Sequence, residues 1–196
     1  ESLLNEIPEN VKVIKNKIWE PYHYYKKLTG RKKTENIQTA FLSEKNYSSG
    51  VIEKLSIWIR GNFFIPDARK FWIKPSVKIL TEYLKKNHID VIVTTGPPHS
   101  AHMIGLHLKQ KTGIPWLADF RDPWTNIDYY NDLKLGKRAD KIHHRLEKLV
   151  LEYADTVTVI SPGMSKEFNQ IVPKEYVVIP NGYDTEDIEK NTKEIT

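Results

Sequence analysis

Short apolar segments alternate with amphipathic helical stretches from residue 75 onward, and this alternation limits the possible folds more than any other feature. Strands joined through helices pair in parallel by right-handed crossovers. The sequence therefore predicts an α/β domain with a Rossmann-like, doubly wound parallel sheet covered by helices on both faces. The four expected strands are DVIVT (90–94), IPWLA (114–118), TVTVI (156–160) and YVVI (176–179).

The expected helices are assigned from apolar side chains at helical spacing. One precedes the first strand, from about residue 75 to 87, with Pro75 at its first position, where proline is favoured. A second covers about 100–111, and a short one covers about 164–170. A long helix before residue 156 has an apolar face made of Ile142, Leu146, Leu149, Val150 and Tyr153.

The first third of the chain is less regular. NVKVI (10–14) is a candidate strand, residues 19–30 a short aromatic helix, and residues 31–50 a polar stretch that we expect to be mobile. An α/β domain normally opens on a strand with its ligand loop, so we expect an initial strand, its loop and a helix to precede Glu1. The domain is expected to occupy residues 1–184, with the start of a linker at 185–196.

The size and composition of the chain exclude several classes of protein. Its 196 residues, 39% hydrophobic and 28% charged, suit one globular domain. The absence of cysteine excludes a disulfide framework and a thiolate site. No apolar stretch approaches the roughly 20 residues that span a bilayer, and the first residues lack the order of a signal peptide, so we expect a cytoplasmic protein. The net charge of +5 suits an anionic partner, although many soluble proteins carry such a charge.

The loop after the first expected strand, TGPPHSAH, is a candidate ligand site. Ligands of open parallel sheets bind beyond the carboxyl ends of the strands. Gly96 allows close backbone approach, two prolines fix the loop, and His99 stands just before a helix start at Ser100. Free N–H groups at that helix start favour a phosphate or a sugar hydroxyl oxygen, with His99 as a neighbouring donor. Alternatively, the prolines merely shape a turn and His99 is a solvated loop residue.

The histidines do not form a convincing metal site. His99 and His102 lie three residues apart on one helical face, but no carboxylate pattern completes a ligand set, so we predict no metal. His143 and His144 are adjacent on a helix, and we expect both on its surface.

The second candidate loop is ADFRDPW (118–124), which follows a buried strand. Arg121 can clamp a carboxylate or a phosphate, and Asp119 or Asp122 can accept hydrogen bonds from sugar hydroxyls. Alternatively, an internal aspartate–arginine ion pair pins the loop, which we favour for Asp122. Beyond the later strands, Ser161 could cap a helix or touch a phosphate, and Asn181-Gly182 mark a turn at a boundary.

Residues 54–75, KLSIWIRGNFFIPDARKFWIKP, interleave aromatic and basic side chains. This pattern suits an anionic lipid surface or a lipid-linked substrate, and it also suits core packing with snorkelling cations, which we favour. An RNA surface would fit the composition, but no RNA- or DNA-binding signature is present, so nucleic acid is not expected as a partner.

The strand-end loops together resemble those of glycosyltransferase family 4. The resemblance is carried by residues 90–184, above all by GPPHS, DFRDPW and NGYD. It implies the N-terminal, acceptor-binding half of a retaining GT-B enzyme, which moves a sugar from a nucleotide-sugar to a glycan or lipid-linked acceptor in cell-surface polysaccharide or glycolipid synthesis. His99, Asp119, Arg121 and Asp122 would line the acceptor side, and Asn181-Gly182 would form the hinge.

The resemblance also implies what this sequence would lack, and the first such feature is the Gly-rich loop after the family's first strand, which we expect to precede Glu1. The family's paired glutamates lie in a second domain, so we expect residues 1–196 alone to bind part of a substrate without efficient transfer. No cofactor is expected beyond the nucleotide-sugar donor. Two other readings stay open: a stand-alone sugar- or nucleotide-binding α/β module without catalysis, and an epimerase of the same GT-B build.

Overall fold

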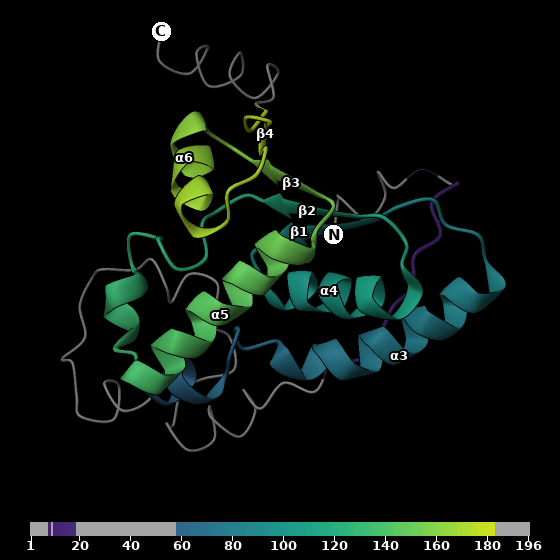
Figure 1. Ribbon diagram of the computed structural model, residues 1–196. Coiled ribbons are helices and arrows are strands. Elements are labelled where there is room, and N and C mark those ends of the chain that lie inside the picture. The colour runs from purple at the N-terminus through teal and green to yellow at the C-terminus, as the bar shows by residue number, and fades with distance from the viewer. Residues whose placement is uncertain (1–7, 9, 19–57, 183–196) are drawn as a thin grey trace, which may run out of the picture.

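The computed structural model describes residues 8, 10–18 and 58–182 (Figure 1). Residues 58–63 are helical. The elements that follow are α3 (Lys70–Lys86), β1 (Ile92–Gly96), α4 (Ser100–Thr112), β2 (Trp116–Phe120), η3 (Tyr130–Leu133), α5 (Lys137–Tyr153), β3 (Thr156–Val159), α6 (Pro162–Ile171) and β4 (Val177–Val178). The predicted aromatic helix at 19–30, the polar stretch at 31–50 and the linker at 185–196 lie outside the described residues.

The four strands form one parallel sheet in the order β1-β2-β3-β4, which confirms the predicted α/β class. β1 and β2 both begin and end two residues later than predicted. Pro115 lacks an N–H for the ladder, and its carbonyl instead accepts a hydrogen bond of 2.8 Å from the Ile92 N–H. As a result Gly96 and Asp119, expected in loops, are strand residues.

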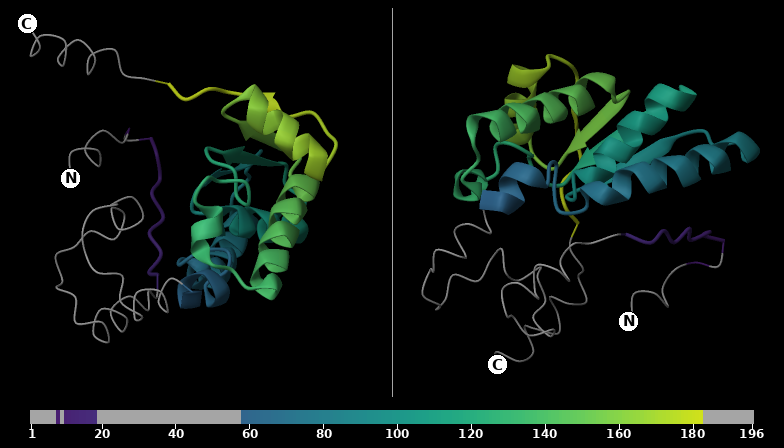
Figure 2. Two further views of the ribbon diagram at one scale, coloured as in Figure 1. Left: turned by 90° about the vertical axis from the view of Figure 1, so that its left-hand side faces the viewer. Right: turned by 90° about the horizontal axis from the view of Figure 1, so that it is seen from below.

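The described helices lie on one face of the sheet (Figures 1 and 2). Because each strand pairs with the next along the chain, successive right-handed crossovers place their helices on the same side. On the opposite face Val93 is 61% exposed, so the described residues do not provide the cover that we predicted there. The main core is buried between α4, α5, α6 and the helix-facing side chains of the sheet, which include Trp116, Ala118, Phe120, Val157 and Val159.

The closest contact between a helix and the sheet occurs at Gly105 of α4. A Cβ at this position would lie 2.4 Å from Trp116 Nε1 and 2.8 Å from Thr94 Cγ2. The Trp116 indole N–H donates to Thr94 Oγ1 (2.9 Å), and the same hydroxyl lies 2.9 Å from His102 Nδ1. This buried polar chain links β2, β1 and α4, so it requires the helix to stand close to the strands.

Two local predictions in the first part of the chain are wrong. Residues 10–14 form no strand, and their segment instead lies beside α3, where Asn16 Nδ2 donates to Ser76 Oγ (3.1 Å) and Lys12 Nζ lies over the Tyr83 ring. The helix predicted to begin at Pro75 begins at Lys70, so Pro75 lies inside it. The aromatic residues before Pro75 continue the helix toward its N-terminus.

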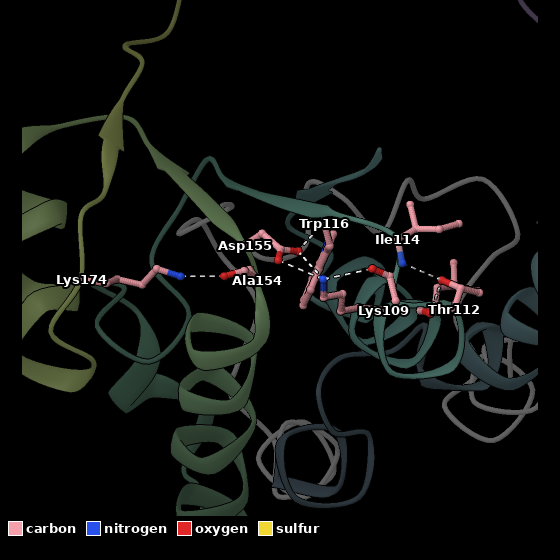
Figure 3. A network of polar contacts seen from close by, with 9 residues as sticks. Lys109, Thr112, Ile114, Trp116, Ala154, Asp155 and Lys174 are labelled. Atoms are coloured by element: carbon pink, nitrogen blue, oxygen red, sulfur yellow. Dashed lines mark hydrogen bonds and ion pairs between the residues drawn. The ribbon is translucent and has the colours of Figure 1, made fainter. Parts of the chain in front are cut away.

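The amino-terminal edge of the sheet is closed by polar contacts within the chain (Figure 3). Asp155, which precedes β3, accepts from Lys109 Nζ (2.8 Å) and from the Trp116 N–H (2.7 Å). Lys174 Nζ donates to the carbonyls of Leu151 (3.1 Å) and Ala154 (2.6 Å), at the C-terminal end of α5. These groups hold strand and helix ends, and so this edge is structural.

Replacement of Gly105 by alanine should destabilise the fold. The added methyl would overlap the Trp116 ring, at a cost of about 1–3 kcal/mol that exceeds the gain in helix propensity of up to about 1 kcal/mol. The matched control is Gly163→Ala in α6, where a Cβ meets only Ser161 Oγ, at 3.7 Å. Urea denaturation should show a lower midpoint for Gly105→Ala and an equal or higher one for Gly163→Ala. A midpoint equal to wild type for Gly105→Ala would contradict the close contact.

Candidate functional site

The carboxyl ends of β1 and β2 are joined by one backbone hydrogen bond. The Arg121 N–H donates to the Gly96 carbonyl (2.9 Å), which ties the start of the DFRDPW loop to the end of β1. Both loops predicted to hold a ligand therefore leave the sheet side by side. The Arg121 residue itself is exposed, and Asp122 is half-buried.

Gly96 is needed for a contact within the domain. A Cβ at this position would lie 2.5 Å from His102 Nε2, so any larger residue would push the α4 histidine away. We predicted close backbone approach at Gly96, and the structure shows His102 as the group that approaches. The predicted role of Gly96 toward a ligand stays a prediction.

His99 stacks on the indole of Trp124. The ring centroids are 4.4 Å apart and the planes differ by only 3°. The next histidine, His102, stacks on Phe120 at 4.3 Å. The His99–Trp124 stack thus joins the two loops, and the His102–Phe120 stack joins α4 to β2; such ring contacts contribute beyond simple burial of area.

Two residues of α5 hold Trp124 in place. Its indole N–H donates to His143 Nδ1 (3.0 Å), which places the proton of that histidine on Nε2. The buried Glu147 carboxylate accepts from the backbone N–H groups of Trp124 (3.1 Å) and Thr125 (3.2 Å) and from the Thr125 hydroxyl. Burial raises the pKa of Glu147 and is the larger effect. The hydrogen bonds from these three donors lower it, but the pKa stays above its ordinary value.

The prediction that His143 lies on the helix surface is wrong, while His144 is exposed as expected. His143 is buried because Trp124 packs onto this side of α5. No sequence signal marks this pairing, since the two residues are 19 positions apart and only the fold brings them together.

The histidines of this site are held in their neutral form. Burial lowers the pKa of His99 to about 3 and that of His102 to about 4, and it also lowers the pKa of His143. Within the described part of the chain, His99 Nδ1, His102 Nε2 and His143 Nε2 are buried without a hydrogen-bond partner. Such nitrogens can donate or accept depending on the tautomer.

The start of α4 is already occupied by a carboxylate. Asp67 Oδ2 accepts from the Ser100 N–H (2.7 Å), and Asp67 Oδ1 accepts from the Ser100 hydroxyl. Ser100 begins the helix as predicted, but Asp67 supplies the cap from a segment 33 residues earlier. This carboxylate lies where we expected a phosphate or a sugar hydroxyl, so that use of the helix start is disfavoured.

Asp119 points to the opposite face of the sheet from His102. Its carboxylate accepts from Thr95 Oγ1 (2.8 Å) and Thr158 Oγ1 (2.6 Å), which lie opposite it on the neighbouring strands. The structure places no ion pair between Arg121 and Asp119 or Asp122 among the described residues, so the internal ion pair considered for this loop does not form. Asp119 can therefore face a ligand only from the sheet's end or from its second face.

The residues that follow β3 and β4 contribute less to the candidate site. The Ser161 hydroxyl caps α6 by accepting from the Met164 N–H (3.2 Å), which supports the capping interpretation. Asn181 and Gly182 follow β4 and are exposed, as expected for residues at a boundary turn. Their role as a hinge stays a prediction.

Asp67, Trp124 and Glu147 were missed by sequence reasoning as organising residues of the site. Asp67 stands shortly before a helix start, and its Pro-Asp sequence could have marked it as a helix-capping residue. The sequence did not indicate that the residue it caps is Ser100. Residues 8, 10–18 and 58–182 contain no cluster of histidine, aspartate or glutamate side chains suited to a metal ion. In the same residues no helix has the length and apolar character needed to cross a membrane.

Comparison with known proteins identifies one family. Residues 43–187, which are more than half of the chain, match the family described as Glycosyltransferase Family 4. No curated protein and no solved structure gives a significant match. The matched range contains both strand-end loops and every described element from α3 to β4.

The lowered histidine pKa values predict a domain that loses stability in acid. Below about pH 6.5 the unfolded chain binds protons at His99 and His102 that the folded chain does not bind until about pH 3–4. The free energy of unfolding should therefore fall with decreasing pH, by up to about 1.4 kcal/mol per pH unit for each histidine. Urea denaturation between pH 7.5 and about pH 4.5 measures this slope.

His99→Phe keeps the stack on Trp124 and should give a shallower slope than wild type. The control Ser161→Ala removes a helix cap, which should lower stability by about 1 kcal/mol at every pH and leave the slope unchanged. A His99→Phe slope equal to that of wild type would show that His99 does not contribute.

Proposed function

Because the chain belongs to glycosyltransferase family 4, we propose that these residues form the acceptor-binding half of a retaining glycosyltransferase. The donor would be a nucleotide-sugar, with no further cofactor. The acceptor would be a glycan or a lipid-linked glycan of a cell-surface polysaccharide or glycolipid, made on the cytoplasmic side of the membrane. The observation that supports this proposal best is the family match over the two loops that meet at the carboxyl edge of the sheet.

The chemistry proposed for the reaction keeps the configuration of the transferred sugar. The bond from the anomeric carbon to the leaving diphosphate breaks, and the acceptor oxygen forms its new bond on the same face of the sugar. The leaving phosphate takes the proton of the acceptor hydroxyl. A general base from the protein is therefore not assigned.

Arg121, which is exposed, is the residue proposed to bind an anionic group of the substrate. Arg121 directly follows β2, and its backbone N–H donates to the Gly96 carbonyl, so the backbone that carries the guanidinium is fixed at the strand end. A guanidinium with paired donors suits an acceptor phosphate or a carboxylate and orients it electrostatically. Asp122, half-buried beside it, is proposed to accept from a sugar hydroxyl.

His99 is proposed as a neutral hydrogen-bonding group. Its ring is fixed by Trp124, and its low pKa keeps it uncharged at neutral pH. A fixed, uncharged imidazole can donate a hydrogen bond to a hydroxyl of the acceptor substrate, or accept one from it, and it does not attract anions. Asp119, held by two threonine hydroxyls, is proposed to contact the ligand only at the strand end.

Turnover by the complete protein that contains this domain is the decisive test. Nucleotide-sugars are screened for transfer to glycan and lipid-linked acceptors, and product stereochemistry is read by NMR. Arg121→Ala and His99→Phe should each lower turnover at least about tenfold, as expected for loss of one positioned polar group. Arg138→Ala, on the exposed part of α5, is the matched control and should keep wild-type turnover.

Two results would contradict the proposal. Sugar or nucleotide binding without transfer to any acceptor would favour the non-catalytic binding module. Interconversion of the nucleotide-sugar with no acceptor present would favour an epimerase. Normal turnover in both site variants would leave the family assignment intact and remove Arg121 and His99 from the site.

A further inference from the structure

A surface rich in lysine and exposed apolar side chains covers one side of the domain away from the sheet. It is formed by two segments that are distant in sequence, residues 10–18 and residues 58–86, and the second includes the helical residues 58–63 and α3. We name it the lysine–aromatic surface. Its exposed members are Val11, Lys12, Val13, Ile14, Lys15, Lys17, Trp58, Ile59, Phe63, Phe71, Lys74, Lys78, Ile79, Lys85 and Lys86.

The aromatic part of this surface is held outward by contacts on the other side of its helix. Gly61 is buried against Leu133 and Leu135, and Asn62 Oδ1 accepts from the Gly136 N–H (2.7 Å). With this side of residues 58–63 fixed, Trp58 is 42% exposed and Phe63 is 59% exposed. Their rings form an edge-to-face pair with centroids 5.7 Å apart, so they project as one unit.

The predicted core packing of residues 54–75 holds for part of the aromatic residues at 58–75, while residues 54–57 lie outside the described residues. Trp72 is half-buried and packs against Val77 and its cluster, which supports core packing for this residue. Phe64 is half-buried beside Phe71, which is 37% exposed. Lys70 lies over both phenylalanine rings, with Nζ 5.2 and 5.0 Å from their centroids. Residues 58–75 therefore divide into a core-facing part and a solvent-facing part.

The charges of this surface have almost a single sign. Residues 10–18 contain three lysines and no acidic residue. Over residues 58–86 the acidic residues are Asp67, which is engaged by Ser100, and Glu82, which pairs with Lys85 at 2.7 Å. The contacts of Lys12 with Tyr83 and of Asn16 with Ser76 bring the two lysine-rich segments together (Figure 2). Positive charges thus surround exposed valine, isoleucine and aromatic side chains.

We propose that the lysine–aromatic surface binds the face of an anionic lipid bilayer. Lysines near such a face are attracted by its negative potential, and aromatic and aliphatic side chains enter the boundary between headgroups and acyl chains. A nucleic acid would use the positive charge but would leave the valines and isoleucines of residues 11–14 and 79 in water. This combination of charge and apolar exposure selects a membrane as the partner.

The position of this surface relates it to the candidate site. Asp67 lies between residues 58–63 and α3, and it caps the helix that starts at Ser100 beside His99. The docked surface would therefore hold the carboxyl edge of the sheet close to the bilayer, where a lipid-linked acceptor is presented. The lipid interaction itself does not depend on sugar transfer, so its test is independent of the proposed function.

The test is co-sedimentation of the chain with vesicles of phosphatidylcholine alone or mixed with phosphatidylglycerol. We expect binding to the mixed vesicles, little binding to phosphatidylcholine, and a decrease with added salt. Trp58→Ser with Phe63→Ser should weaken binding at least about tenfold, and Lys74→Glu with Lys78→Glu should do the same. All four positions are exposed, and circular dichroism checks that the variants fold.

The matched control for charge is Arg145→Glu with Lys166→Glu, which changes the net charge equally on α5 and α6 and should leave binding within about twofold of wild type. Wild-type chain that fails to bind the mixed vesicles would overturn the proposal. Equal loss in the control would also overturn it, because net charge alone would then explain the binding. Tighter binding to single-stranded RNA than to the vesicles, unaffected by Trp58→Ser with Phe63→Ser, would assign the surface to nucleic acid.

Discussion

The close approach of α4 to the first two strands is the constraint on which the rest of the domain depends. Two residues without side chains permit it: Gly105 leaves room for the Trp116 indole, and Gly96 leaves room for His102. The approach allows Thr94 to join Trp116 and His102 in one buried hydrogen-bonded chain. It also sets the position of the helix start at Ser100. Everything at the carboxyl edge of the sheet is therefore positioned by packing within the core.

The candidate site shows how a rigid edge can be built largely from neutral groups. Trp124 lies at its centre, stacked on His99, hydrogen-bonded to His143 and held through its backbone by Glu147. Charged side chains occupy the margins, with Arg121 exposed and Asp119 turned to the second face of the sheet. A polar ligand would meet a preorganised surface in which few groups must move, which lowers the cost of binding. This arrangement supports the proposed acceptor role.

The fold from residue 75 onward could be predicted because its signals are local. Apolar runs and helical spacing identified all four strands and the helices between them, although Pro115 shifted the start of β2. The strand order could not be predicted from the sequence, so it was not foreseen that the described residues would leave the second face of the sheet uncovered. The loop residues proposed for the site could be proposed from the sequence, and their role stays a prediction, whereas the residues that contact them in the fold could not be predicted. Asp67 caps the helix that begins at Ser100, and Trp124 buries His143. These partners are 33 and 19 residues apart, and the periodicity of a sequence gives no information about contacts at such separations.

The sequential order of the strands has a consequence for how the domain acquires its structure. Each strand pairs with the next one along the chain, so the sheet is assembled from contacts between neighbouring units. Paired residues are 24 positions apart between β1 and β2, 39 between β2 and β3 and 19 between β3 and β4, so each pairing closes one helical connection and no longer stretch of chain. During synthesis, β1 and β2 with α4 between them can pair before β3 and β4 have left the ribosome. The sheet then grows by one strand and one helix at a time, each addition using an edge that the previous one has completed.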